Sequence, residues 1–326
     1  MAETKRPTIP AAEEILGGYF PVLDHGFVSL VDYMGTDDDI ERAARVSYGY
    51  GTRKRSATRG LIRYLRRHAH TTPSEMVEFK FHCSMPIFIA RQWIRHRTAS
   101  VNEYSGRYSL MPLLFYKPES TSFALQSAVN NQGREDQPAD PSLYADAIAR
   151  WESLREQASD TYGWLVSEDI ARELARIDLP LSTYTQWYWK IDLHNLLHFL
   201  RLRADPHAQW EIQEYGRVMA GMLARVAPLT YEAWLDYDVL GARMSAAELA
   251  VIRSLVEPTG EGLRARPGEL SAADLKSAGL SGRASRELFD KLQPAERPDF
   301  ALDLADMRTP ESMADRMAEA VPDSAV

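Results

Sequence analysis

Hydrophobic and polar residues alternate over several segments of the chain, which is the pattern of half-buried β-strands. Residues 26–34 (GFVSLVDYM) are rich in β-forming side chains and predict a first strand. Residues 77–84 (VEFKFHCS) predict a second strand and place Cys83 on its apolar face. Residues 182–191 (STYTQWYWKI) predict a third strand, again from their aromatic and β-branched side chains.

Two helices are predicted between the first and second strands. The acidic run at residues 36–39 follows Gly35 and begins a helix, because negative charge in the first turn complements the helix dipole. Ser56 is predicted to cap the next helix, which buries apolar residues at helical spacing and ends near residues 68–70. The basic run at residues 53–70 fits a solvated helix face and a phosphate site equally well.

Another helix is predicted directly after the second strand, since Pro86 suits a first helical position. Apolar residues at helical spacing carry this helix far enough to place Gln92 and Arg95 on one side. After Arg97 the apolar period stops and a polar stretch begins. Gly106 in that stretch permits a turn or the close approach of a ligand.

The middle of the chain is predicted to contain a surface loop and two helices. Residues 119–142 are polar and irregular, and we expect a loop ahead of a helix at about residues 144–163. A second helix is predicted from about Ser167 until Pro180 prevents its continuation. Its inward-facing residues are predicted to be Ile170, Leu174 and Ile177.

Helical patterns follow the third strand as well. Asp192 is predicted to cap a short helix, and Asp205 with Pro206 to open another. The buried side of the short helix is predicted to consist of Leu193, Leu196, Leu197 and Leu200. Beyond about Gly241, helix-like patches alternate with proline and glycine, and residues 309–311 predict one further short helix.

Composition limits the class of protein. With 326 residues, 45% of them hydrophobic, the chain can bury one large core or two modest ones. The opening residues have no apolar segment typical of a signal peptide, and no run of about eighteen apolar residues suits a membrane span. The single cysteine, Cys83, has no partner for an internal disulfide, which agrees with a reducing compartment. These features predict a cytoplasmic protein that does not bind membranes.

Charge points to local binding of anions. The net charge is −8, and most of the acidic excess lies in the C-terminal part of the chain. A nearly balanced body gives no general attraction to nucleic acid, so anionic ligands must be bound by clusters of arginine. Residues 95–109 (RHRTASVNEYSGRYS) form such a cluster and combine cations, one carboxylate and hydroxyls. Surface ion pairs with Glu103 would explain any single arginine, but not the whole segment.

The same segment carries a family resemblance. An Arg-His-Arg triplet at residues 95–97, followed after seven residues by Ser105, resembles the signature of the flavin-dependent thymidylate synthases. The resemblance continues in RAARVSYG near residue 45, HTTPSEMVEFKFH from residue 70 and LRLRADPHAQWEIQEY near residue 208. It covers roughly residues 26–240.

The resemblance implies a fold and a domain organisation. It implies an α+β fold with a twisted, mainly antiparallel sheet and packed helices, to which a C-terminal helical extension is added. The catalytic domain is expected at residues 1–243, the extension at residues 244–292 and a flexible tail at residues 293–326. The family forms homotetramers whose flavin sites are shared between subunits, so one chain alone is expected to be inactive.

The resemblance also implies a reaction, the reductive methylation of dUMP to dTMP. Non-covalently bound FAD supplies hydride, 5,10-methylenetetrahydrofolate supplies the carbon and NADPH reduces the flavin, so that the cofactor carries the chemistry. Classical thymidylate synthases use an attacking cysteine instead. Cys83 lies in a strand among aromatic residues with no evident cationic neighbour, and is predicted to be structural.

Site residues follow from the resemblance. Arg203 is the predicted catalytic residue, because a guanidinium can stabilise negative charge that develops on the pyrimidine. The residues predicted to bind dUMP are Gln92, Arg95, Glu103, Tyr104, Ser105, Gly106, Arg107, Arg176 and Arg203. Those predicted to bind FAD are Ser47, His70, Thr72, Glu75, Arg95, His96, Arg97, Glu103, Asp192, His194 and His198. Family members often have asparagine and arginine in place of Asp192 and His194, and asparagine in place of His198.

The sequence is also compatible with two other functions. A non-enzymatic nucleotide-binding or RNA-binding protein would use the arginine clusters without turnover. A metal-dependent hydrolase would use His194 and His198, which are four residues apart on a predicted helix, although the glutamate that follows the first histidine of a metalloprotease helix is missing. No metal is therefore expected. Ser105 lacks a recognisable His and Asp arrangement, so a hydrogen-bonding role is predicted for it.

Overall fold

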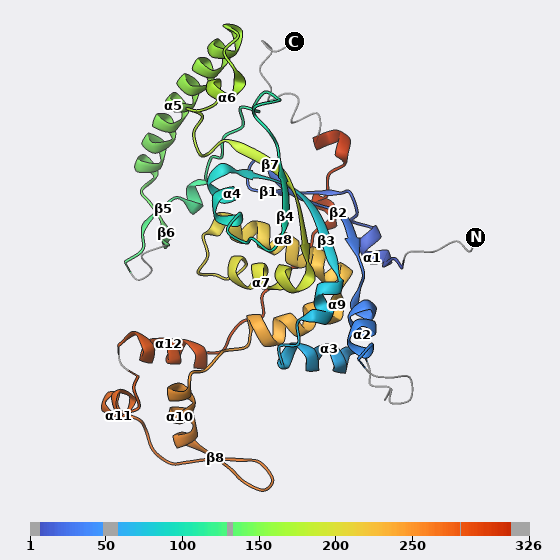
Figure 1. The fold of residues 1–326 in the computed structure, drawn as a ribbon. Coiled ribbons are helices and arrows are strands. Elements are labelled where there is room, and N and C mark those ends of the chain that lie inside the picture. The colour runs from blue at the N-terminus through green and yellow to red at the C-terminus, as the bar shows by residue number, and fades with distance from the viewer. Residues whose placement is uncertain (1–6, 48–57, 129–132, 281, 314–326) are drawn as a thin grey trace, which may run out of the picture. The chain divides into compact units, whose positions relative to one another are not determined.

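The computed structural model describes residues 7–47, 58–128, 133–280 and 282–313. The chain divides into two compact units (Figure 1). The first contains the residues up to 233 and those from 300 onward, and the second contains residues 234–299. None of the helices within the described ranges is long and apolar enough to cross a membrane.

A five-stranded antiparallel sheet forms the centre of the first unit. Its order is β1 (Tyr19–Val22), β2 (Gly26–Met34), β3 (Glu78–Pro86), β7 (Tyr184–Asp192) and β4 (Ser100–Glu103). The three predicted strands are β2, β3 and β7, and they are confirmed. The short edge strands β1 and β4 were not predicted, because four residues carry too little periodicity.

One face of the five-stranded sheet lines the hydrophobic core. Along β3, Phe79, Phe81 and Cys83 are fully buried, and their partners in β7 are Ile191, Trp189 and Trp187. The prediction that Cys83 lies on the apolar face is confirmed. Burial raises the pKa of its thiol well above the usual value, because the thiolate would lose its hydration.

Three helices cover this face (Figure 1): α4 (Ile87–Trp93), α7 (Leu193–Arg203) and α8 (Trp210–Val226). The ring of Trp93 joins them, since it stacks on Phe199 of α7 at 5.0 Å and meets Tyr215 of α8 edge-on at 5.7 Å. The side chain of Asp192 caps α7, as predicted, by accepting from Asn195 N at 3.0 Å. The four leucines predicted to be buried in α7 are all buried.

The N-terminal half also contains several short helices. They are α1 (Pro10–Glu13), α2 (Asp37–Arg45), α3 (Thr58–Arg67) and the 3-10 turn η1 (Thr72–Met76). Thr36 and Asp39 form a capping box at the start of α2, which confirms the helix predicted from the acidic run. Ser56, the predicted cap of α3, lies outside the described residues. Asp37 accepts hydrogen bonds from Leu229 and Thr230 at the start of α9 (Pro228–Trp234).

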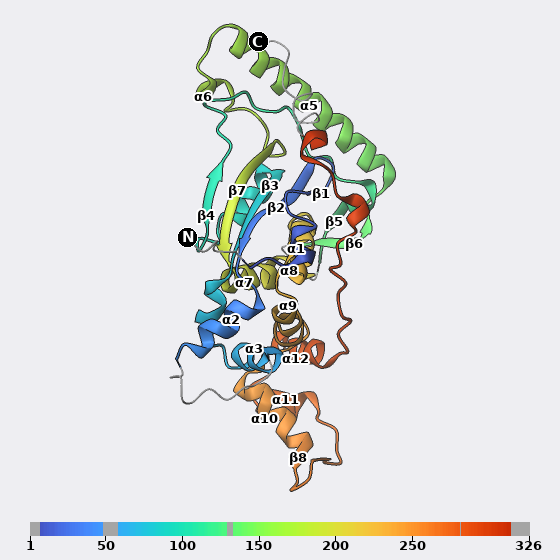
Figure 2. The ribbon, with the colours of Figure 1, turned by 90° about the vertical axis from the view of Figure 1, so that its right-hand side faces the viewer.

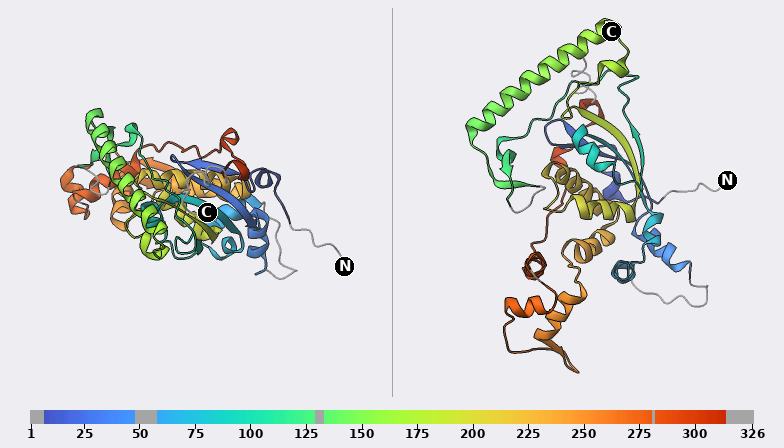
Figure 3. Two further views of the ribbon diagram at one scale, coloured as in Figure 1. Left: turned by 90° about the horizontal axis from the view of Figure 1, so that it is seen from above. Right: turned by 60° about the vertical axis from the view of Figure 1, so that its left-hand side comes forward.

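The predicted surface loop at residues 119–142 is in part ordered secondary structure. It contains the 3-10 turn η2 (Ser120–Ser122) and a two-stranded hairpin of β5 (Ala124–Gln126) and β6 (Arg134–Pro138). The helix α5 (Pro141–Ser167) follows and is longer than predicted. It lies away from the five-stranded sheet over most of its length (Figure 3), and only Ile148 and Tyr162 of α5 are buried.

The helix predicted from Ser167 is wrong in length and in orientation. Only the four-residue α6 (Arg172–Ala175) forms, because Asp169 adopts a left-handed φ of 59° that ends α5. The residues predicted to face inward are exposed: Ile170 by 40%, Leu174 by 56% and Ile177 by 70%. Ala175 is the residue of α6 that is buried.

The second unit has a small core of its own. Its elements are the π-helical turn η3 (Leu235–Val239), α10 (Ala246–Leu255), β8 (Val256–Pro258), β9 (Leu263–Ala265), α11 (Ala272–Ser277) and α12 (Arg283–Leu292). Val251, Leu275, Leu280 and Leu288 form its buried cluster. The helix-like patches predicted beyond about Gly241 correspond to α10, α11 and α12, while the hairpin β8–β9 was not predicted.

The described C-terminal segment returns to the first unit. Arg308 pairs with Tyr19 of β1 through two backbone hydrogen bonds, after the turn η4 (Leu304–Asp306). A helix begins at Pro310, where residues 309–311 predicted one. The predicted domain boundaries at 243/244 and 292/293 stay predictions.

Candidate active site

Arg203, the predicted catalytic residue, is held by a histidine of the arginine-rich segment. Its Nε donates to Nε2 of His96 at 3.0 Å, which joins the last residue of α7 to the loop after α4. Burial is the main cause that lowers the pKa of His96 to about 4, and the positive charges of Arg203 and Arg95 add to it. His96 is therefore neutral near pH 7 and accepts the hydrogen bond. Burial, together with the charge of Arg95, lowers the pKa of Arg203 as well.

Gln92 and Arg95 do not share a helix face as predicted. The helix α4 ends at Trp93, and Arg95 and Arg97 are exposed in the loop that follows. The Gln92 side chain instead donates a hydrogen bond to the side chain of Gln209, the residue before α8. Sequence spacing overestimated the length of the helix because Ile94, which continues the apolar period, lies in the partly exposed C-cap.

The residues predicted to bind FAD lie mainly around α7. The turn η1 carries Thr72 and Glu75 and begins just after His70. It packs against both α7 and α2. Ser47 lies in the turn that follows α2. On α7 itself, His198 lies with its ring 6.0 Å from that of His96. The turn η1, the helix α7 and the loop with His96 thus come together within one chain.

A second group of predicted residues lies at α6. Arg107 forms an ion pair with Glu173 at 3.0 Å, and Arg172 donates to the carbonyl oxygen of Tyr108 at 2.5 Å. Gly106 is buried between Met111 and Arg176, and an added Cβ would approach Arg176 Cδ at 3.1 Å and Met111 Sδ more closely still. The loop around Ser105 is thus fixed against α6.

Two predicted residues on and after β4 make contacts within the chain. The carboxylate of Glu103 accepts from Thr185 Oγ1 of β7 at 2.8 Å. The hydroxyl of Tyr104 donates to the carbonyl oxygen of Leu110, and its ring packs in the cluster around Tyr162. Their assignment to dUMP stays a prediction.

The two groups are separate within one chain. Among the described residues, no hydrogen bond, ion pair or ring contact joins Arg203, His96 and Gln92 to Ser105, Arg107 and Arg176. In Figures 1 and 2, α6 lies beyond one end of the sheet, whereas α7 lies against its covered face.

A metal site at α7 has little support in the geometry. Across the parts of the chain that the structure describes, no three His, Cys, Asp or Glu side chains are placed to hold an ion together. His198 instead lies among positive charges, and burial together with Arg201, His194 and Arg203 lowers its pKa.

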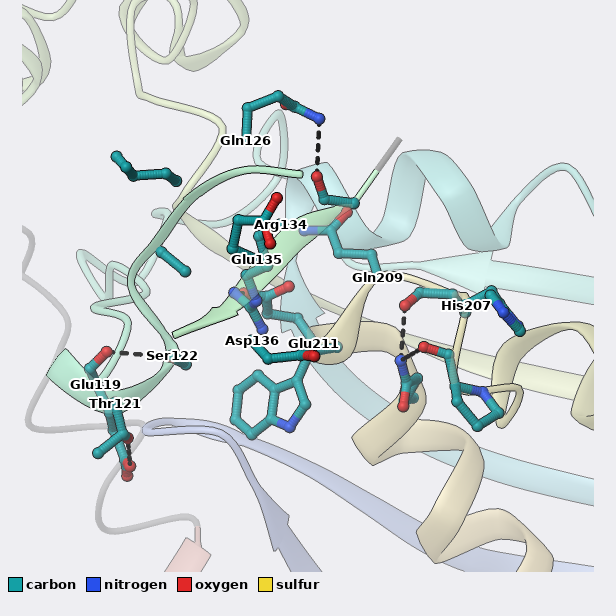
Figure 4. A pocket seen from close by; sticks show the side chains of 17 residues that line it. Glu119, Thr121, Ser122, Gln126, Arg134, Glu135, Asp136, His207, Gln209 and Glu211 are labelled. Carbon is teal, nitrogen blue, oxygen red and sulfur yellow. Dashed lines mark hydrogen bonds and ion pairs between the residues drawn. The ribbon is translucent and has the colours of Figure 1, made fainter. Parts of the chain in front are cut away.

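A pocket of about 690 Å³ was not expected from the sequence (Figure 4). It lies between the hairpin β5–β6 and residues 206–213. Glu211 in its wall is only 4% exposed and forms an ion pair with Arg134 at 3.0 Å. A glutamate two residues after Gln209 is visible in the sequence, but its burial and its partner depend on the hairpin.

Comparisons with known proteins identify the family. The profile of the family described as "Thymidylate synthase complementing protein" matches residues 29–229. The flavin-dependent thymidylate synthase of Rickettsia conorii is 51% identical over 78% of this chain and 90% of its own. That of Gluconobacter oxydans is 54% identical over 77% of this chain and 83% of its own. The chain belongs to the flavin-dependent thymidylate synthase family.

A solved structure of this family's fold is also similar. The UMP/dUMP methylase PolB from Streptomyces cacaoi, bound with 5-Br UMP, matches with a TM-score of 0.61 and 34% identity. The match covers 67% of this chain and 98% of that one. The predicted membership of the flavin-dependent thymidylate synthases and the predicted α+β fold are both confirmed.

The side chains around α7 fit the flavin that the family name requires. The pyrophosphate of FAD needs cations and N–H donors, and Arg95 and Arg97 are exposed beside His96. His194 has a buried Nδ1 with no hydrogen-bond partner in the described part of the chain, which a ligand can satisfy. The individual contacts of each FAD residue stay predictions.

Proposed function

We propose that this protein converts dUMP to dTMP, with 5,10-methylenetetrahydrofolate as carbon donor and NADPH as reductant. Membership of the family supports the reaction class. The observation that carries the proposal for this chain is the contact between Arg203 and His96, because it fixes a guanidinium from α7 against the segment that bears the family signature.

Arg203 is proposed to polarise the pyrimidine. The carbon C5 of uracil becomes nucleophilic when electron density enters the ring, and a cation beside the ring oxygen or N3 stabilises that charge. Because Nε of Arg203 is engaged by His96, the two terminal nitrogens are left to face the ligand. His96 is a neutral acceptor here and fixes the guanidinium without cancelling its charge.

FAD, bound without a covalent link, would supply hydride to the uracil ring. The chain's own contribution is to bind and orient, through the residues around α7 for FAD and the two arginine groups for dUMP. Cys83 takes no part in this, since it is fully buried and its pKa is raised. A cytoplasmic location fits a single buried cysteine that forms no disulfide.

The complete site is proposed to form between chains of a homotetramer. Ser105, Arg107 and Arg176 lie apart from Arg203 within one chain, although a single dUMP would need both groups. We call Gln92, Arg95, His96 and Arg203 the α7 group, and Ser105, Arg107 and Arg176 the α6 group. A second copy of the chain can bring its α6 group to the α7 group of the first. The exposed apolar residues after α5, including Leu174 and Ile177, support a packed interface at α6.

The test is dTMP formation from dUMP, methylenetetrahydrofolate and NADPH under low oxygen. Protein stripped of flavin is compared with the same protein after FAD is restored, and we expect product only with FAD. If folded, tetrameric, FAD-loaded protein forms no dTMP but binds dUMP, the signature serves binding alone. A non-enzymatic nucleotide-binding protein would then be the better description.

A further inference from the structure

Arg134 of the hairpin β5–β6 forms an ion pair with Glu211, which is buried. Glu211 lies in the first turn of α8, and its Oε1 accepts from Arg134 Nη1 at 3.0 Å and from Tyr116 OH at 3.2 Å. Its Oε2 is buried without a hydrogen-bond partner. Arg134 is therefore the cation that compensates a buried carboxylate, and a carboxylate in this position is unfavourable without it.

Arg134 contacts two successive residues of α8. Besides its ion pair with Glu211, its guanidinium lies 5.5 Å from the ring centre of Trp210, the first residue of the helix. A cation over an indole face adds electrostatic attraction. Figure 4 shows Arg134 and Glu211 in one wall of the pocket, with Gln209 and His207 on the adjoining segment. The hairpin thus fixes the beginning of α8 from one side.

The beginning of α8 in turn supports residues assigned to dUMP. Gln209, which precedes the helix, accepts the hydrogen bond of Gln92. Two turns further, Gly216 packs against the backbone after Arg203, where an added Cβ would lie 3.2 Å from Arg203 C and 3.1 Å from Ala204 N. A shift of α8 would therefore move Gln92 and the backbone of Arg203 together.

The segment between these two contacts is tied to the same helix. The side-chain amide of Gln213 donates to the carbonyl oxygens of Pro206 at 3.1 Å and Ala208 at 2.6 Å. Residues 204–209 therefore follow α8 closely, and displacement of its first turn cannot be absorbed by a loose loop.

From these contacts we infer that Arg134 is a positioning residue for dUMP binding. It acts through Glu211 and the first turn of α8, and does not touch the substrate. The hairpin, at the site of the expected surface loop, is thus coupled to the nucleotide site. This inference rests on the proposed function, because it needs dUMP as the ligand of Gln92 and Arg203.

The test compares kcat and KM for dUMP in the FAD-loaded enzyme and its Arg134→Met variant. We expect KM to rise about tenfold and kcat to fall by a smaller factor, because a displaced Gln92 weakens ground-state binding and a displaced Arg203 also weakens the transition state. Arg134→Lys should recover much of the affinity, since it restores the charge. Asp136→Asn, on the same strand, is the matched control for a change of one charge and should keep the wild-type KM.

A second variant separates positioning from stability. Arg134→Met alone leaves the buried Glu211 carboxylate uncompensated and should lower the melting temperature. Adding Glu211→Gln removes that charge, so the double variant should melt at a higher temperature than Arg134→Met while its KM stays raised. Wild-type KM in both variants would overturn the inference, as would an equal loss of kcat and bound flavin with KM unchanged. Failure of the wild-type enzyme to form dTMP would instead contradict the proposed function.

Discussion

Single residues of the site show how burial sets protonation. His96 and Arg203 are both partly buried, and the positive charges near His96 act in the same direction as the loss of hydration. A neutral imidazole is the only form of His96 that can accept from the Arg203 guanidinium.

The His96 contact predicts a dependence of stability on pH. The pKa of His96 is about 4 in the folded protein against 6.5 ordinarily, so the unfolded chain binds more protons between these values. Its contribution to the free energy of unfolding is present above pH 6.5 and is lost as the pH falls towards 4. We expect urea denaturation between pH 7 and 5 to show a steeper loss for the wild type than for His96→Gln. Parallel losses would contradict the assignment, since the other histidines titrate in both proteins.

Cys83 allows a prediction that separates packing from chemistry. Its side chain is fully buried between Val28 and Trp187 in the register of the sheet. Cys83→Ala should lower the free energy of unfolding by about 1–2 kcal/mol through the lost contacts. The rate of dTMP formation should not change, as measured with flavin saturated. A large loss of turnover in a folded variant would show that the thiol takes part in the reaction.

At the scale of elements, caps and tertiary hydrogen bonds join helices distant in the sequence. Asp37 is buried in the first turn of α2, yet its carboxylate accepts from Leu229 N at 2.8 Å and from Thr230 N at 3.0 Å at the start of α9. One carboxylate thus supplies the cap of a helix almost two hundred positions away.

Loss of that carboxylate should weaken the first unit. We expect Asp37→Ala to lower the free energy of unfolding by about 2–3 kcal/mol, because buried N–H donors of α9 lose their acceptor. Asp38→Ala, in the same turn but exposed, is the matched control and should change it by less than about 0.5 kcal/mol. Chemical denaturation of both variants measures the difference, and equal effects would contradict a specific role for Asp37.

At the scale of the whole molecule, the separation of the two arginine groups predicts complementation between subunits. Arg203→Ala and Arg107→Ala should each be inactive alone. Random mixing of the two in the proposed tetramer should restore up to about a quarter of the sites, those that take an intact group from each kind of chain. Mixed tetramers are prepared by co-expression with two affinity tags, and dTMP formation is measured.

The control for this experiment uses two residues of the same group. Arg203→Ala mixed with Arg95→Ala should give no recovery, because every α7 group then lacks one arginine. Recovery in that mixture, or none in the first, would show that the site is not divided between chains in the proposed way.

The sequence by itself determined the features that depend on local periodicity and on motif. The strands β2, β3 and β7, the cap at Asp192 and the buried leucines of α7 follow from side-chain alternation and capping chemistry, which act within a few residues. The segment from Arg95 to Ser105 was sufficient to indicate the family, since its cations and spacing are unusual together.

Only the tertiary structure decided which distant residues meet. The exposed Leu174 and Ile177 have helical spacing, but the left-handed turn at Asp169 leaves too short a helix to bury them. The partners Arg203 with His96 and Glu211 with Arg134 lie 107 and 77 positions apart. Such pairs are selected by the packing of α7 and α8 on the sheet, and a period of two or 3.6 residues contains no information about them.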